Sequence, residues 1–340
     1  MGLFDFMFRK TQPASPPAQV PPTRALDWRY SEPHLLLLSQ FLLAQRPEWL
    51  SQPYLEEALG EKPDVAISRF IAEGMLVQAS LAGKLQTTFK PAELKPFLKE
   101  RNLRVSGAKA DLIERLIAAD PDGMAAKVAH ENILECSPEA RAIAETHVGR
   151  MRADKDAAIA ESLALLKAHN FAKASLSVSS YEAKQVHPRG VGIDWSNPDA
   201  RENTNMLRTI FERRPKLLDG LADSEWEPLR IGAAMMHLWG SSRASQWLPQ
   251  DFVGIEKFDN DTAARMILFN AQHATRIARD RKIGVKRFKI LGSGDSCPAC
   301  KRIAGKAFPI ESIPDLPYEH CTCAMGCRCE ALPMSGHNSP

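Results

Sequence analysis

Apolar residues near the start of the chain gather in three short blocks, each long enough for about two to three helical turns. Proline or glycine residues bound the second and third blocks, and such residues commonly begin and end helices. The pattern therefore predicts three helices, at His34–Leu43, Pro53–Leu59 and Pro63–Ile71.

Two further segments, Leu76–Ala79 and Lys84–Phe89, flank Leu81-Ala82-Gly83, a sequence typical of a hairpin turn between strands. Three helices followed by a hairpin resemble a winged-helix domain, which we expect over residues 28–88. Such a domain can place its third helix in a major groove of DNA.

The exposed face of that third helix would carry Asp64, Ser68 and Arg69 and is therefore poor in positive charge. Nucleic-acid backbones are bound chiefly by Lys and Arg side chains. The winged-helix-like domain could thus contact either DNA or another protein.

Most of the remaining chain has helical patterning. Residues 122–190 place Ile159, Leu163 and Leu166 at helical spacing. Residues 191–291 are expected to form a second helical domain, with a long helix over Asp259–Lys282 and a basic end. The sequence therefore predicts a mainly α, multidomain protein.

The two ends of the chain differ from this helical part. Residues 1–27 are rich in proline and lack periodic apolar positions, which predicts a disordered tether. Residues 335–340 are expected to form a short tail.

Composition adds limits to this picture. The chain has 340 residues, 44% of them hydrophobic and 25% charged, as in ordinary soluble proteins with more than one domain. The net charge is only +3, so any nucleic-acid surface has to come from a local patch. No apolar run approaches the length of a membrane span, and the first residues lack the pattern of a signal peptide. We therefore expect a cytoplasmic protein with no membrane partner.

The clearest local patch lies at residues 89–121. Two apolar stripes at helical spacing predict two short helices that pack on each other. The first stripe contains Leu94, Phe97 and Leu98, and the second contains Leu112, Ile113 and Leu116.

Val105-Ser106-Gly107 predicts a tight turn between these helices, and Ser106 is expected to cap the second one. The exposed amides near Gly107 open a helix N-terminus, which is a natural site for a phosphate group. Residues 89–117 contain seven basic and four acidic side chains, so the polar surface of the pair is basic.

This segment resembles the SAP motif, a short helix pair that binds DNA. One departure is Asn102, where the family often has glycine, but Asn tolerates a left-handed backbone and the turn is still expected. The matching residues are Ala92-Glu93-Leu94-Lys95, Leu98 and Leu103, Ser106-Gly107-Ala108-Lys109, and Asp111-Leu112-Ile113-Glu114-Arg115-Leu116.

The resemblance implies that the protein binds DNA through backbone phosphates, with little sequence specificity. By analogy with the family, a set of cations and one exposed amide would make the contacts. They are Lys95, Lys99, Arg104, Gly107, Lys109 and Arg115.

Six of the seven cysteines fall within residues 292–334. Cys297-Pro-Ala-Cys300 has the spacing that lets two thiolates converge on one ion, and a second cluster follows about twenty residues later. In a reducing compartment, such clusters predict a zinc module rather than disulfides. The candidate ligands are Cys297, Cys300, Cys321, Cys323, Cys327 and Cys329.

Zinc takes four ligands, so we expect Cys297 and Cys300 plus two of the others, with Cys321 and Cys327 slightly favoured. A two-zinc cluster of all six stays open, although its usual spacing is absent. An all-thiolate site is closed, which indicates a structural zinc. The seventh cysteine, Cys136, is expected to be a core thiol.

Residues 276–289 contain seven basic side chains and one acidic side chain, Asp280. This basic segment could contact phosphate groups. It could equally be a solvated helix end, whose cations interact favourably with the helix dipole.

Residues 259–333 resemble the C-terminal part of phage Mu-type head morphogenesis proteins. The resemblance rests on a basic strand at Lys286–Leu291, Gly-Asp-x-Cys-Pro-x-Cys, a Gly-Lys-x-Phe turn and a final Cys-Arg-Cys. That family usually has a histidine before its final Cys-x-Cys, and here Cys321 and Cys323 take its place. The resemblance implies a bacterial or phage-related protein that works in virion assembly through protein contacts.

The sequence offers no clear catalytic constellation, since it lacks a phosphate-binding glycine loop, a nucleophile elbow and a zinc-protease motif. We assign no catalytic residue and consider an enzyme the less favoured interpretation. A DNA-processing nuclease remains a third alternative. It would use His320 beside the cysteines, or Glu182, Lys184 and Asp194.

Overall fold

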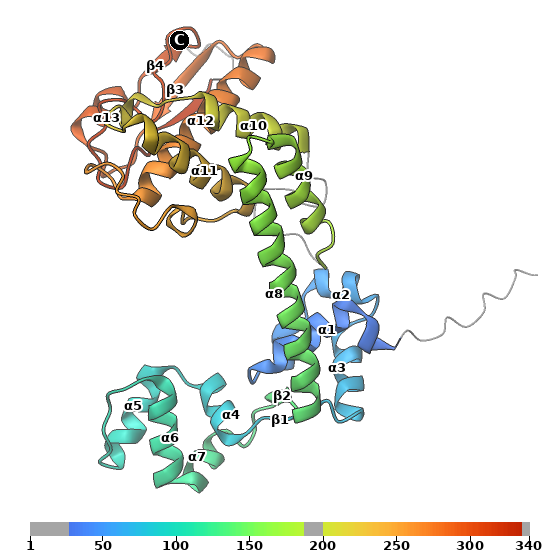
Figure 1. Cartoon of the computed structure of the whole chain (residues 1–340). Coiled ribbons are helices and arrows are strands. Elements are labelled where there is room, and N and C mark those ends of the chain that lie inside the picture. Colours follow the sequence, from blue (N-terminus) through green and yellow to red (C-terminus); the bar gives the residue numbers. More distant parts are fainter. Residues whose placement is uncertain (1–26, 187–199, 335–340) are drawn as a thin grey trace, which may run out of the picture. The chain divides into compact units, whose positions relative to one another are not determined.

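The structure is a computed structural model of the chain and describes residues 27–186 and 200–334 (Figure 1). The expected tether, the tail and Asp194 lie outside these residues. The described part is mainly helical, as the sequence predicts. The described residues form two compact units, with the boundary between Val148 and Gly149.

The first unit opens with the three predicted helices. They end near the expected residues, and Gly60 closes the second with a left-handed backbone at φ 70°. Their apolar faces form one core around Phe41 and Phe70, both fully buried. The helices are α1 (Glu32–Ser39), α2 (Pro53–Leu59) and α3 (Pro63–Ala72).

The predicted hairpin after these helices is wrong. β1 (Leu76–Gln78) is a strand, but the segment expected to pair with it lies in the helix α4 (Leu81–Thr88). Ser80 begins that helix, because its hydroxyl accepts a hydrogen bond from the Gly83 amide at 3.2 Å. β1 pairs instead with β2 (Leu134–Cys136), in antiparallel register.

A four-helix module is therefore inserted between the two paired strands. Its helices share a hydrophobic core that is separate from the core around Phe41 and Phe70. The predicted helix pair is confirmed as the middle of this module. The helices are α4, α5 (Pro91–Glu100), α6 (Lys109–Ala119) and α7 (Pro121–Lys127).

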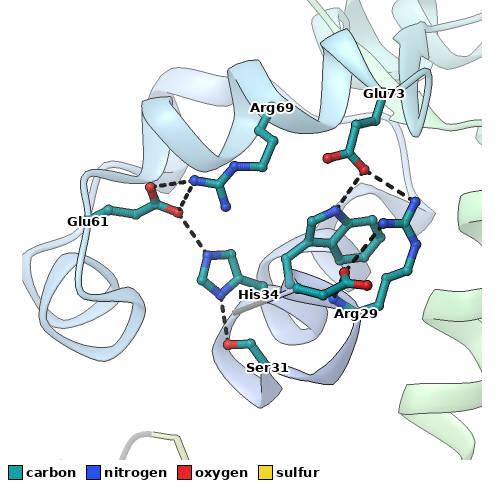
Figure 2. A network of polar contacts seen from close by, with 8 residues as sticks. Arg29, Ser31, His34, Glu61, Arg69 and Glu73 are labelled. Carbon is teal, nitrogen blue, oxygen red and sulfur yellow. Dashed lines mark hydrogen bonds and ion pairs between the residues drawn. The ribbon is translucent and has the colours of Figure 1, made fainter. Parts of the chain in front are cut away.

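A polar network joins the first and third of these helices (Figure 2). The imidazole of His34 on α1 contacts Ser31 Oγ at 2.7 Å and Glu61 Oε1 at 2.8 Å. Arg69 on α3 donates to both oxygens of Glu61, at 2.9 and 2.7 Å. Glu61, in the turn before α3, thus joins two helices through one carboxylate.

The helices of the second unit enclose the largest hydrophobic core found among the described residues. α8 (Pro138–Lys167) runs for 30 residues and begins in the first unit. The long helix predicted near the end of the chain is confirmed. The other helices of this core are α9 (Phe171–Glu182), α10 (Ala200–Glu212), α11 (Asp223–Trp239) and α12 (Asn260–Lys282).

A small antiparallel sheet follows α12, with β3 (Arg287–Leu291) between β4 (Ala307–Pro309) and β5 (Glu330–Pro333). Exposed and buried residues alternate along β3, with Phe288 and Ile290 fully buried in the core of the unit. The predicted basic strand is therefore confirmed. Among the described residues, no helix is long and apolar enough to cross a membrane.

Candidate nucleic-acid interface and metal centre

The helix pair α5–α6 is positioned by its buried leucines. Leu94 and Leu98 of α5 pack against Leu112 and Leu116 of α6, and all four are almost fully buried. Each helix has an acidic side chain in its first turn that accepts a hydrogen bond from the backbone amide three residues earlier. Glu93 accepts from the Lys90 amide at 2.6 Å, and Asp111 accepts from the Ala108 amide at 3.0 Å.

The turn between the helices depends on two special backbone positions. Asn102 adopts a left-handed conformation at φ 54°, as its sequence position led us to expect. Gly107 has φ 130°, and a Cβ atom there would lie 2.7 Å from a guanidinium nitrogen of Arg115. The predicted cap by Ser106 is wrong, because α6 begins after Ala108, and Ser106 Oγ instead accepts from Arg104 Nε at 2.8 Å.

The six predicted DNA contacts separate into two groups. Lys95, Lys99, Arg104 and Gly107 are exposed. Lys95 and Lys99 stand four residues apart and so lie on one face of α5. This first group can meet a partner without any rearrangement of the module.

Lys109 and Arg115 are half-buried and already bound within the module. The Lys109 ammonium donates to the Gln86 carbonyl, and burial lowers the pKa of Lys109. Arg115 donates to the carbonyls of Arg104 and Ser106, the latter at 2.8 Å. Arg115 therefore holds the turn between α5 and α6, and Lys109 joins the start of α6 to α4.

A further arginine of the module was not singled out in the sequence. Arg101 Nε donates to Asp120 at 3.0 Å, which joins the end of α5 to the start of α7. The pair also lowers the pKa of the Asp120 carboxyl, mainly through the hydrogen bond from Arg101. Arg101 is thus engaged in an ion pair within the module. The sequence near Arg101 does not indicate that Asp120 is its partner.

All six clustered cysteines converge in the second unit. Cys297 and Cys300 flank the start of α13 (Pro298–Ile303), and the others lie in the loop that leads to β5. Their sulfur atoms form two groups in which all atoms lie within 4.8 Å of one another. One group is Cys297, Cys300, Cys321 and Cys323, and the other is Cys300, Cys327 and Cys329.

These separations suit metal coordination. A Zn–S bond of about 2.3 Å in a tetrahedron implies sulfur–sulfur separations of about 3.8 Å. The Sγ atoms of Cys297 and Cys321 lie 4.0 Å apart, as do those of Cys300 and Cys327. The described cysteines are all free thiols rather than disulfides.

Hydrogen bonds favour the thiolate form of two of these cysteines, Cys297 and Cys327. Burial would raise the pKa of Cys297, but hydrogen bonds from the Thr322 and Cys300 amides outweigh it and lower the pKa to about 5. A hydrogen bond from Cys329, with a further one from the Tyr318 amide at 3.4 Å, lowers the pKa of Cys327 to about 6. Amide hydrogen bonds of this kind orient metal ligands.

The cysteine-bearing loop is fixed to the helices by polar and backbone contacts. Asn270 of α12 is fully buried, donates to the Leu316 carbonyl at 2.7 Å and accepts from Arg213 at 2.6 Å. Arg213 also binds both oxygens of Asp315 at 2.8 Å. Gly326 has φ 78° and passes so close to Met266 that a Cβ atom would lie 2.8 Å from its sulfur. The loop is therefore held in place by Arg213, which follows α10, and by residues of α12, in addition to the contacts among the cysteines.

Most of the basic segment at residues 276–289 is open to solvent. The exception is Arg276, which pairs with Glu330 of β5 at 2.9 Å. The alternation along β3 turns Arg287 and Lys289 to the exposed face of the sheet. The segment has the accessibility that phosphate contact would need, and this role stays a prediction.

The remaining candidates are placed as follows. Cys136 is a buried core thiol, as predicted, and burial raises its pKa to about 11. His320 is mostly exposed, pairs with Glu319 and belongs to neither cysteine group. Glu182 is buried at the end of α9, a helix, whereas a nuclease core would need it on a strand.

Comparison with known proteins identifies one part of the chain. Residues 87–121 match the family model of the SAP domain. Searches of curated proteins and of solved structures gave no match, and the resemblance to phage head morphogenesis proteins gains no support from them. The matched residues cover the end of α4, all of α5 and α6 and the start of α7, so the inserted module contains a SAP domain.

Proposed function

We propose that this protein binds DNA through its SAP domain, chiefly by contacts to backbone phosphates and with little sequence preference. The observation that carries the proposal is the SAP match on a helix pair whose surface cations are accessible. SAP domains are commonly DNA-binding modules.

The exposed group supplies the chemistry that a phosphate backbone needs. Lys95 and Lys99 project from one face of α5 as flexible point charges, while Arg104 precedes the turn. The exposed Gly107 lies just before the N-terminus of α6, where amide groups and the helix dipole favour an anion. These contacts carry no base information, which accounts for weak sequence preference.

A salt titration tests this proposal. The full chain is mixed with labelled duplexes of two unrelated sequences, and the dissociation constant is measured over a range of salt concentrations. We expect similar affinities for both duplexes and a linear fall of log affinity with log salt. Binding that is absent, or that does not change with salt, would contradict the proposal.

We infer in addition that the cysteine module holds a structural zinc ion through Cys297, Cys300, Cys321 and Cys323. Four cysteine sulfurs within 4.8 Å of one another supply the number of ligands that a tetrahedral zinc site needs. Bound zinc would stabilise a loop-rich segment that has few regular elements of its own. Metal analysis of protein purified without added zinc tests this, and a metal-free, folded chain would argue against it.

Free thiols in such a site suit the cytoplasm, where we place the protein.

We propose one alternative function, a virion or prophage assembly role, which is motivated by the order α12, β3, α13 and the final cysteines in the second unit. Portal and capsid genes beside this one in the genome would favour that role, and their absence would count against it.

A further inference from the structure

One tetrahedral zinc ion leaves two of the six clustered thiols without a role. Cys297, Cys300, Cys321 and Cys323 complete the first site. Cys327 and Cys329 remain, with only 3% and 1% of their surfaces exposed, and both lie within 4.8 Å of Cys300. Cys300 is the one cysteine that belongs to both groups.

The surroundings of this second group differ from those of an ordinary core thiol. Cys136 shows the ordinary case, since its sulfur donates to the Leu38 carbonyl and lies apart from the other cysteines. Cys327 instead accepts a hydrogen bond from the Tyr318 amide, and its sulfur faces Cys300 at 4.0 Å. Backbone donors directed at a sulfur, beside other sulfurs, are the setting of a metal ligand.

We propose that the module binds two zinc ions, with the Cys300 thiolate as a bridge between them. This rests on the zinc site proposed above and extends it. The first ion has four thiolate ligands. The second has Cys300, Cys327 and Cys329, and its fourth position is left to a ligand from outside the cysteine set.

A cleft beside the second group gives a fourth ligand access to the second ion. It has a volume of about 660 Å³, and Cys327 and Cys329 are among its lining residues. Arg265, Arg276 and Arg328 also line it, so a water molecule or a small anion could reach the ion there. The second ion would therefore have one coordination position not filled by a cysteine, whereas four cysteines fill the first site.

Metal content distinguishes this proposal from the simpler one. The full chain is purified under reducing conditions and its zinc is measured against protein concentration. We expect two zinc ions per chain in the natural protein and one after Cys329→Ser, with two retained after Cys136→Ser as the matched control. One zinc in the natural protein would overturn the second site and leave the first standing. An absence of zinc would remove both.

Cadmium-113 substitution tests the bridge itself, and it needs no variant to fold. Two resonances split by mutual coupling are expected, because a shared thiolate transmits coupling between the two metals. The Cys329→Ser chain, if folded by circular dichroism, should show one uncoupled resonance. Two uncoupled resonances, or a single one in the natural protein, would refute the bridging role of Cys300.

Discussion

Leu76 of β1 lies directly opposite Cys136 of β2, although the whole SAP-containing module separates them in the sequence. The Ala79 amide donates to the Ile133 carbonyl at 2.8 Å, so the chain leaves and re-enters the sheet at adjacent points. The module is thus an insertion with its own core, carried by a sheet that belongs to the N-terminal domain.

This arrangement predicts that the module can be removed. Replacing residues 81–131 by a short hairpin turn should leave the N-terminal domain folded, because adjacent strand ends need only a few connecting residues. DNA affinity should fall to the background level. Circular dichroism and the salt titration measure the two effects. Loss of folding would show that the two cores depend on each other.

Removing the accessible lysines should weaken DNA binding without affecting stability. We expect Lys95→Ala combined with Lys99→Ala to reduce affinity about tenfold, since exposed ion pairs contribute up to about 1 kcal/mol each. The slope of log affinity against log salt should become shallower by about 0.9 for each phosphate that the variant no longer neutralises. Lys155→Ala, at an exposed site on α8, is the matched control. An unchanged slope would exclude both lysines from the interface.

We expect Arg115 to contribute to DNA binding by stabilising the turn between α5 and α6, and not by its charge alone. Arg115→Lys keeps the positive charge but cannot hold the carbonyls of both Arg104 and Ser106. We expect the module to lose about 1–2 kcal/mol of stability and DNA affinity to fall with it. Thermal unfolding and the binding assay report the two quantities. Full retention of both would show that the hydrogen bonds to the turn are unimportant.

The contacts of Glu61 indicate that the stability of the N-terminal domain depends on pH. Burial would raise the pKa of this carboxyl, but the hydrogen bonds from His34 and Arg69 outweigh burial and lower it (Figure 2). A lowered folded-state pKa stabilises the protein above the unfolded value of about 4.3, and this contribution is lost as the pH falls through the folded value.

Glu61→Gln should therefore lower the free energy of unfolding by about 1–2 kcal/mol at neutral pH and by less at acidic pH. Denaturant unfolding at several pH values measures this difference. Glu57→Gln, at an exposed position on α2, controls for the loss of one carboxylate. A difference that is constant with pH would mean that the ionised form of Glu61 is not what stabilises the domain.

Zinc removal should affect the two units differently. A strong chelator is expected to destabilise the cysteine module of the second unit, because metal ligation holds its loop. DNA affinity should change little, since the SAP core lies in the first unit. Binding and thermal unfolding are measured before and after chelation, with zinc added back to show reversal. A parallel loss of DNA binding would show that the second unit contributes to it.

The sequence by itself determined the features that depend on nearby residues. The stripe of Leu94 and Leu98, the left-handed Asn102 and the long α12 all follow from spacing or backbone preference within a few residues. Cys297 and Cys300 were paired for the same reason, because two residues between them bring their sulfurs toward one point.

Tertiary structure alone decided the features that join distant residues. Local pattern could not show that Leu76 pairs with Cys136, since a short apolar segment does not specify its strand partner. It could not show that Lys95 is accessible while Arg115 is already hydrogen-bonded, because the guanidinium of Arg115 donates to carbonyls eleven and nine residues earlier. It also could not show that Cys300 is shared by two thiol groups, because that depends on how the final loop folds back onto α13.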